Sequence, residues 1–184
     1  MVREISFQEH RNTIAQIRRE VFTSGLLRDI DEFDEAAHHF ALFNHAEEIT
    51  GVIRVLRSDE VPKLELQSES DAQELVFPKG VLLMEVSRGC ARKTPLGTPL
   101  LKMALAMQDY AKRQNAAHLV TKSGARLLPL YRSLGFRVFG KPFYSDYFDD
   151  RKTGLLSTPI IYDFVKPAPV VRQKVEAEEE VLVW

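Results

Sequence analysis

The chain has 184 residues, of which 25 are basic and 26 are acidic, and its formal net charge is −1. Nucleic-acid-binding domains usually carry a basic excess, so this balance argues against a nucleic-acid partner. No apolar run approaches the length of about 18 residues that spans a bilayer, and the polar N-terminus does not resemble a signal peptide. The single cysteine, Cys90, cannot form an internal disulfide. We therefore expect a cytoplasmic protein without a membrane span.

Apolar periodicity and turn residues divide the chain into helices and strands. Ile14, Ile17 and Val21, for example, recur at helical spacing among polar residues. The polar stretch 57–80 predicts a long loop, with a short helix near 70–75. The other expected elements, in chain order, are a helix over 8–22, strands over 39–43, 49–56 and 81–91, a helix over 99–113, a strand over 118–123, a helix over 125–135, and strands over 136–144 and 159–165.

A mixed α/β sheet covered by helices satisfies this order of elements. Residues 1–165 are expected to form one domain, because their hydrophobic residues suffice for a single core. Residues 166–184 change in composition, with two prolines followed by an acidic run. We interpret this segment as a C-terminal tail outside the domain.

One junction carries the residues of a possible phosphate site. The expected strand 81–91 leads into a short loop and then into the helix after Pro99. Such a loop can aim backbone N–H groups and a helix N-terminus at a phosphate. An ordinary connection between strand and helix is the alternative. The residues that would bind the phosphate are Arg92, Lys93, Gly97 and Thr98.

A second motif is Y-R-S-L-G-F at 131–136, where a helix is expected to end at Gly135. Tyr131 lies four residues before this glycine, on the helix face that looks towards the sheet. On that face, its hydroxyl could donate a proton to a thiolate leaving group. The alternative is that Tyr131 packs as an ordinary amphipathic side chain.

Together these two motifs resemble the GNAT acyltransferase superfamily over about residues 10–145. The loop matches the family pattern Q/R-x-x-G-x-G/A partly, through Arg92, Pro95 and Gly97. The resemblance implies the GNAT fold, with a mixed and mostly antiparallel central sheet. It also implies a phosphopantetheine thioester as donor, its phosphate on the 92–98 loop and its sulfur near Tyr131.

Four further fragments narrow the resemblance to one branch of this superfamily. In order, they are R-x-x-V-F, D-x-x-D, G-x-x-R and E-x-S-R, the pattern of acyl-homoserine-lactone synthases and N-acyl amino acid synthases. The chain lacks the tryptophan that lactone synthases carry after the first fragment, and Gly89 stands where they favour phenylalanine. An N-acyl amino acid is therefore the expected product, with acyl carrier protein as partner and donor, or acyl-CoA in its place. The residues in these fragments are Arg18, Phe22, Asp31, Asp34, Arg54, Glu85 and Arg88.

The reaction needs a base, because an amino acid's ammonium must lose a proton before its nitrogen attacks a thioester. Glu85, on the central strand, is our candidate. Glu85 and Arg88 would point to opposite faces of a regular strand, so we expect a bulge near Ser87, which would also free an N–H for the oxyanion. The remaining residues of the four fragments are expected to bind the acceptor or to organise the site. Arg18 and its neighbour Arg19 are also expected to face the carrier protein.

Three alternatives remain open. In the first, the charged residues have a structural role only, as ion pairs that hold Asp31 and Asp34 on the sheet. In the second, the protein is an ordinary N-acetyltransferase that uses acetyl-CoA and a small amine. In the third, it is an inactive GNAT-fold binding module. No cluster of His and Cys has zinc spacing, so no metal is expected.

Overall fold

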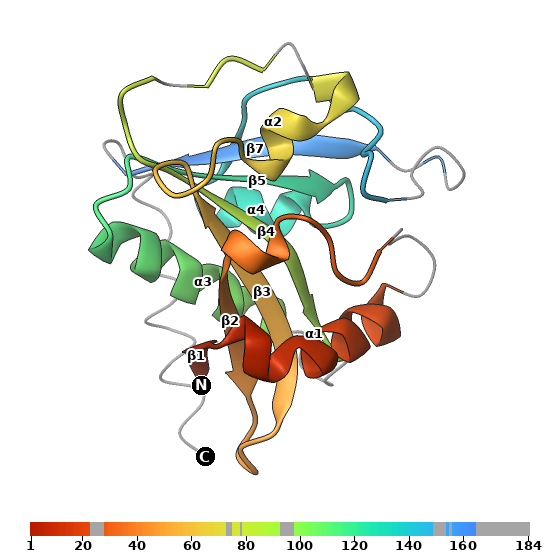
Figure 1. Cartoon of the computed structure of the whole chain (residues 1–184). Coiled ribbons are helices and arrows are strands. Elements are labelled where there is room, and N and C mark those ends of the chain that lie inside the picture. Colours follow the sequence, from red (N-terminus) through yellow and green to blue (C-terminus); the bar gives the residue numbers. More distant parts are fainter. Residues whose placement is uncertain are drawn as a thin grey trace.

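The structure is a computed structural model that describes residues 1–22, 28–72, 75–77, 79–92, 98–148, 154 and 156–164. Seven strands form one sheet with the order β1-β2-β3-β4-β5-β7-β6 (Figure 1). Every neighbouring pair is antiparallel except β4 and β5, which are parallel. The elements are β1 (Val2–Ile5), α1 (Phe7–Val21), η1 (Asp34–Ala36), β2 (His38–Phe43), β3 (Ile49–Arg57), α2 (Glu65–Ser68), η2 (Ser70–Ala72), β4 (Leu83–Ala91), α3 (Thr98–Arg113), β5 (His118–Gly124), α4 (Leu128–Ser133), β6 (Arg137–Val138) and β7 (Ser157–Asp163).

The predicted fold class is confirmed, and so is the order of the long elements. Sequence reasoning missed β1, a four-residue edge strand, and α2, a single helical turn within the predicted loop. The strand expected over 136–144 was too long, because β6 has two residues and Phe143 then forms an isolated bridge with Ser157. The tail over 166–184 lies outside the described residues.

The two faces of the sheet are covered by different helices (Figure 1). Helix α3 packs on β4, β3, β5 and β1, whereas α1 packs on β3 and β4 from the opposite side. Under α3 lies the largest apolar cluster, which includes Met84, Met103, Met107 and Leu119. Within the described residues, no helix is both long enough and apolar enough to cross a membrane.

The two parallel strands separate halfway along their length. β4 and β5 pair from Leu83 and His118 only as far as Glu85 and Val120. Beyond this point β4 continues to pair with β3, and β5 with β7. The two strands therefore diverge, and a cleft opens between them at the centre of the sheet.

A β-bulge lies at the start of this cleft. Cys90 pairs with Val52 and Ser87 with Arg54, so two residues of β4 oppose the single residue of β3 between them. Arg88 has a φ of 55°, in the left-handed region that non-glycine residues rarely adopt. The predicted bulge near Ser87 is confirmed, and its residues Ser87, Arg88 and Gly89 line the cavity described below.

Candidate active site

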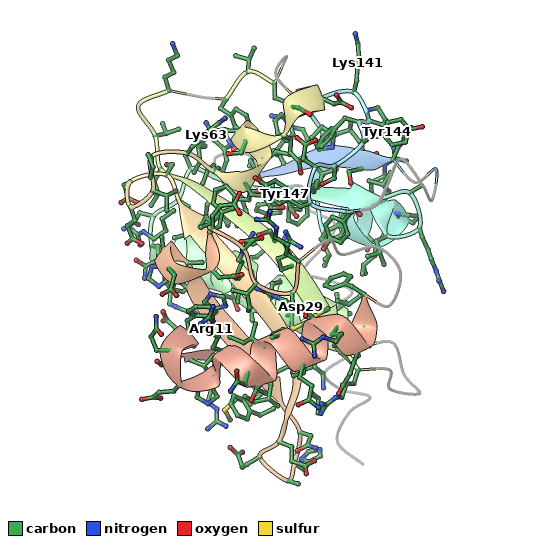
Figure 2. The ribbon with its side chains drawn as sticks, turned by 45° about the vertical axis from the view of Figure 1, so that its right-hand side comes forward. Arg11, Asp29, Lys63, Lys141, Tyr144 and Tyr147 are labelled. Carbon is green, nitrogen blue, oxygen red and sulfur yellow. The ribbon has the colours of Figure 1, made fainter. Side chains whose placement is uncertain are left out.

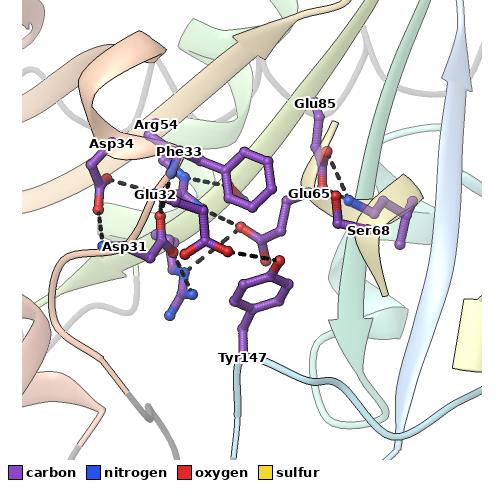
Figure 3. Close-up of polar contacts among 12 residues, drawn as sticks. Asp31, Glu32, Phe33, Asp34, Arg54, Glu65, Ser68, Glu85 and Tyr147 are labelled. Carbon is purple, nitrogen blue, oxygen red and sulfur yellow. Dashed lines mark hydrogen bonds and ion pairs between the residues drawn. The ribbon is translucent and has the colours of Figure 1, made fainter. Parts of the chain in front are cut away.

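Arg54 is the centre of a buried ionic cluster on the α1 side of the sheet (Figure 3). Its Nε donates to Ser87 Oγ at 2.8 Å on the neighbouring strand β4. Its Nη1 donates to Asp31 Oδ1 at 2.5 Å and lies 3.0 Å from Asp34 Oδ1, while Nη2 donates to Glu65. Burial alone would lower the pKa of Arg54, but these three carboxylates raise it above its ordinary value. The guanidinium is thus fixed in its charged form.

Arg18 and Asp34 form a second buried pair, between α1 and η1. Arg18 donates through Nη1 and Nη2 to the two oxygens of Asp34 at 2.8 and 2.9 Å. Burial would raise the pKa of Asp34, but Arg18 and Arg54 lower it to about 2. Arg18 is only 1% exposed, so the expectation that it faces a carrier protein is wrong. Arg19 is exposed and pairs with Asp29 on the surface.

Arg88 projects from the bulge of β4 towards the same cluster. Its Nη2 donates to Asp31 Oδ2 at 2.6 Å, and its Nε lies 3.8 Å from Glu65 Oε2. The guanidinium carbon lies 5.5 Å from the ring centre of Tyr147 and 5.2 Å from that of Phe148. Its Nη1 has no hydrogen-bond partner among the described residues. Two of its donors, Nη1 and Nε, therefore lack a hydrogen bond within the described residues although the side chain is buried.

Glu85 occupies the last paired position before β4 and β5 diverge. Both carboxyl oxygens accept from the backbone N–H of Leu66 in α2, each at 3.0 Å. Burial and the charge of Glu65 raise the pKa of Glu85 to about 8. Glu85 is fully buried and is not among the residues that line the two cavities described below.

Lys122 and two carboxylates complete the cluster, and sequence reasoning missed all three. Lys122, on β5, lies 2.7 Å from Glu65 Oε1 and also pairs with Glu69. Burial would raise the pKa of Glu65, but Lys122, Arg54 and Arg88 hold it well below its ordinary value. Two features of the sequence could have indicated these residues. Lys122 is a lysine inside a β-rich run, and Glu65 and Glu69 are two glutamates four residues apart in E-L-Q-S-E.

The charges in this cluster balance only if one carboxyl group is protonated. Among the described residues, the buried cations are Arg18, Arg54, Arg88 and Lys122, and the buried carboxyl groups are Asp31, Asp34, Glu65, Glu69 and Glu85. Glu85 is the member of this set whose pKa is raised, because it is fully buried and lies near the charge of Glu65. A proton on Glu85 makes the two sets equal.

Two cavities meet at Arg88. The first, of about 290 Å³, lies on the α2 side, where Tyr147 sits between α1 and α2 (Figure 2). The second, of about 120 Å³, lies where β4 and β5 diverge. The first is lined by Arg28, Glu32, Ser68, Arg88, Asp146 and Tyr147, and the second by Phe22, Ile53, Glu65, Val86, Ser87, Arg88, Gly89, Thr121, Lys122, Ser123, Leu127, Tyr131 and Phe148.

The second cavity brings together several of the predicted residues. Phe22 and Tyr131 reach it from opposite sides of the sheet, and Arg88 and Gly89 supply the bulge between them. Burial raises the pKa of Tyr131, so its hydroxyl keeps its proton near neutral pH. This is the state that a proton donor to a thiolate requires.

The predicted phosphate loop is described only at its ends. Arg92 donates to Glu20 Oε2 at 2.8 Å on α1, as a half-exposed surface pair. Lys93, Gly97 and the side chain of Thr98 lie outside the described residues, although α3 does begin at Thr98. Phosphate binding by this loop therefore remains a prediction.

Neither the thiol nor the histidines point to other chemistry. Burial raises the pKa of Cys90 to about 12, which makes it a poor nucleophile. His39 bonds the backbone oxygen of Asp34, and His38 lies between Glu4 and Glu60. Within the described part of the chain, no group of three or more His, Cys, Asp or Glu residues is arranged to hold a metal ion.

A mixed sheet whose central parallel strands diverge over a cavity with a tyrosine and a bulge agrees with the α/β acyltransferase fold that the sequence resemblance implied. The chain belongs to the GNAT family, because the model described as "Acetyltransferase (GNAT) domain" matches residues 3–105. It is therefore an N-acyltransferase by family. A search of the curated proteins finds no match.

Several solved structures share the fold. FeeM, an N-acyl amino acid synthase from uncultured soil microbes, has a TM-score of 0.73 and 17% identity, over 94% of this chain and 96% of FeeM. BjaI, a CoA-dependent acyl-homoserine lactone synthase solved with SAM and isopentyl-CoA, has a TM-score of 0.67 and 19% identity, over 98% of this chain and 88% of BjaI. TofI in an apo form has a TM-score of 0.66 and 19% identity, over 89% of both chains. At these identities the likeness shows the fold alone.

Proposed function

We propose that this protein transfers an acyl group from a phosphopantetheine thioester to the amine of an amino acid or a related acceptor. The observation that carries this proposal is the meeting of two different cavities at Arg88. The cavity between β4 and β5 suits the thioester, because it is narrow and contains Tyr131 and the bulge. The polar cavity beside it suits a charged acceptor.

In the proposed reaction the amine nitrogen attacks the thioester carbonyl carbon directly. The negative charge that develops on the carbonyl oxygen would be stabilised by a backbone N–H of the bulge at Arg88 and Gly89. One such donor contributes about 3 kcal/mol in other enzymes. The carbon–sulfur bond then breaks, Tyr131 donates its proton to the leaving thiolate, and the second proton that the attacking nitrogen loses passes through water to restore the tyrosine hydroxyl. The products are an N-acyl amine and free phosphopantetheine thiol.

Glu85 is the proposed acceptor of the proton that the ammonium loses. With a pKa of about 8, Glu85 is mostly protonated at neutral pH, so it takes this role in its ionised form, and turnover should rise as the pH approaches 8. Glu85 is not among the cavity-lining residues, so a proton must reach it through an intervening water or through Glu65, which lines the cavity. Arg18, Arg54, Asp31 and Asp34 would hold the cavity wall in place.

Acyl carrier protein is the proposed partner and donor, with acyl-CoA as the alternative donor. Acyl carrier protein presents a single phosphate, which suits a loop that matches the pyrophosphate pattern only partly. Among the structural neighbours, BjaI is CoA-dependent by its own description. The buried free thiol of Cys90 suits the reducing cytoplasm, where we place the protein.

An acetyl-CoA-dependent N-acetyltransferase is the second candidate. The volume of the β4–β5 cavity, about 120 Å³, favours a short acyl group. Two structural neighbours are also described as an N-acetyltransferase or an acetyltransferase.

One assay separates these functions. The purified chain is incubated with the twenty amino acids and with acetyl-CoA, long-chain acyl-CoA or long-chain acyl carrier protein, and products are identified by mass spectrometry. We expect N-acyl amino acids from long-chain acyl carrier protein, and much less product from Tyr131→Phe. Product from acetyl-CoA alone would favour the second candidate. An absence of both product and donor binding would leave an inactive binding module.

A further inference from the structure

Arg88 is a buried cation with two donors, Nη1 and Nε, that are unpartnered within the described residues, and it is among the residues that line the two cavities. Its side chain is 1% exposed, and its Nη2 is engaged by Asp31 at 2.6 Å. Its Nη1 has no hydrogen-bond partner in the part of the chain that the structure describes. A buried, unsatisfied charged donor costs far more than an exposed one, so its retention calls for a ligand.

We propose that Arg88 Nη1 binds the carboxylate of the acceptor, so that the enzyme selects amines that also carry a free carboxylate. This inference rests on the proposed function, whose acceptor it specifies. A guanidinium is suited to this task, because its planar N–H groups match the geometry of a carboxylate.

The charges around Arg88 support an incoming anion. Burial lowers the pKa of Arg88, Arg54 and Arg18 act in the same direction, and Glu65 and Asp31 only partly offset them. A bound carboxylate would relieve this repulsion. The ring contacts with Tyr147 and Phe148 hold the guanidinium in place from the side.

The same cavity offers groups for the other end of a zwitterion. Glu32 and Asp146 line it together with Arg88, and both are carboxylates that can accept from an ammonium. Asp146 is held by the backbone N–H and hydroxyl of Ser70, at 2.5 and 2.8 Å. Glu32 accepts from Tyr147 Oη at 3.3 Å.

The test compares acceptors that differ only in the carboxylate. Each amino acid that is acylated is assayed against its α-amide and against the amine formed by its decarboxylation. Compared with the amino acid, the α-amide has a lower amine pKa and the decarboxylated amine has a higher one. A loss of kcat/KM common to both is therefore due to the missing carboxylate and not to the amine pKa. We expect both to fall at least about 10-fold in kcat/KM, mainly through KM, because a hydrogen bond to a charged group has this strength.

The variants then assign the effect to one residue. Arg88→Gln should bring the acid-to-amide ratio of kcat/KM close to one. Arg28→Gln is the matched control, since Arg28 lines the same cavity, and it should keep the ratio. Because Arg88→Gln alone leaves Asp31 with fewer partners, the double variant Arg88→Gln with Asp31→Asn is measured as well. Calorimetric binding of the acid and of its amide, without donor, gives a readout that needs no turnover.

The outcomes separate this inference from the proposed function. Equal use of acids and amides by the unmodified protein would overturn the role of Arg88 and leave acyl transfer standing. The role of Arg88 would also be overturned if Arg28→Gln lost the preference for amino acids over their amides while both Arg88 variants kept it. If no amine is acylated, the proposed function fails, and the binding measurement still decides whether Arg88 selects a carboxylate.

Discussion

The two faces of the central sheet bury different side chains at their centre, although apolar clusters flank the ionic one on the α1 and α2 face. Beneath α3 the sheet presents methionine, valine and leucine side chains, such as Met84 and Leu119, to an apolar core. Beneath α1 and α2 the same strands present Arg54 and Glu85 to a buried ionic cluster (Figure 3), which Lys122 of β5 joins through Glu65. β4 supplies both layers, because its alternate residues point to opposite faces.

The difference teaches which face serves stability and which serves function. Burial of apolar surface is the main favourable term in folding. Buried ion pairs gain little net free energy, because desolvation offsets their attraction, although removing one partner is strongly destabilising. A cluster of this size beside two cavities therefore points to chemistry rather than to stability.

The largest effect is expected at the centre of the ionic face. Arg54→Met would leave Asp31, Asp34 and Glu65 without the cation that joins them. We expect the free energy of unfolding at pH 7 to fall by about 3 to 5 kcal/mol. Urea denaturation followed by circular dichroism measures this change. A loss below about 1 kcal/mol would show that the carboxylates do not depend on Arg54.

A comparable but separable effect is expected on the apolar face. Met103 is fully buried under α3, and Met103→Ala should lower the free energy of unfolding by about 2 to 4 kcal/mol through lost burial and a cavity. Turnover per folded molecule should stay the same, since this side chain lies away from the proposed site. A variant that stays stable but loses turnover would contradict the division between the two faces.

The smallest effect is expected at the neighbouring surface pair. Arg19 has a 71% exposed side chain and pairs with Asp29, so Arg19→Gln should change the free energy of unfolding by no more than about 0.5 kcal/mol. Arg18→Gln, one residue earlier on the same helix, should be far more damaging because it uncovers the buried Asp34. Equal effects of the two changes in the same denaturation assay would refute the ranking by burial.

Much of the fold could be predicted because its long elements have clear periodicity. Ile14 and Ile17 marked α1, and the β-branched run ending near Leu56 marked β3. β1 and α2 were missed because each has four residues, too few for a period to show. Their formation depends on tertiary contacts, such as the pairing of Val2 with Leu42.

The site was predicted where residues lie within recognisable fragments, and missed where only the fold brings them together. The spacing of Glu85 and Arg88 predicted a bulge, and the register of β4 confirms it. Glu65 and Lys122, by contrast, are 2.7 Å apart but come from a short turn and from another strand. No local pattern joins two such positions.

The central claim is that the ionic face lowers the stability of the fold in return for chemistry. The most direct test compares Glu85→Gln with the unmodified chain and measures the free energy of unfolding of both from pH 5 to pH 8. The ordinary pKa of this carboxyl is 4.5 and its folded pKa is about 8. Between these values the folded state keeps a proton that the unfolded state has lost, so stability falls as pH rises, by at most about 1.4 kcal/mol per pH unit. Glutamine does not titrate, so the variant should become the more stable protein towards pH 8, while turnover falls by about 100-fold or more. A variant that is less stable at pH 8 and keeps its turnover would contradict the account.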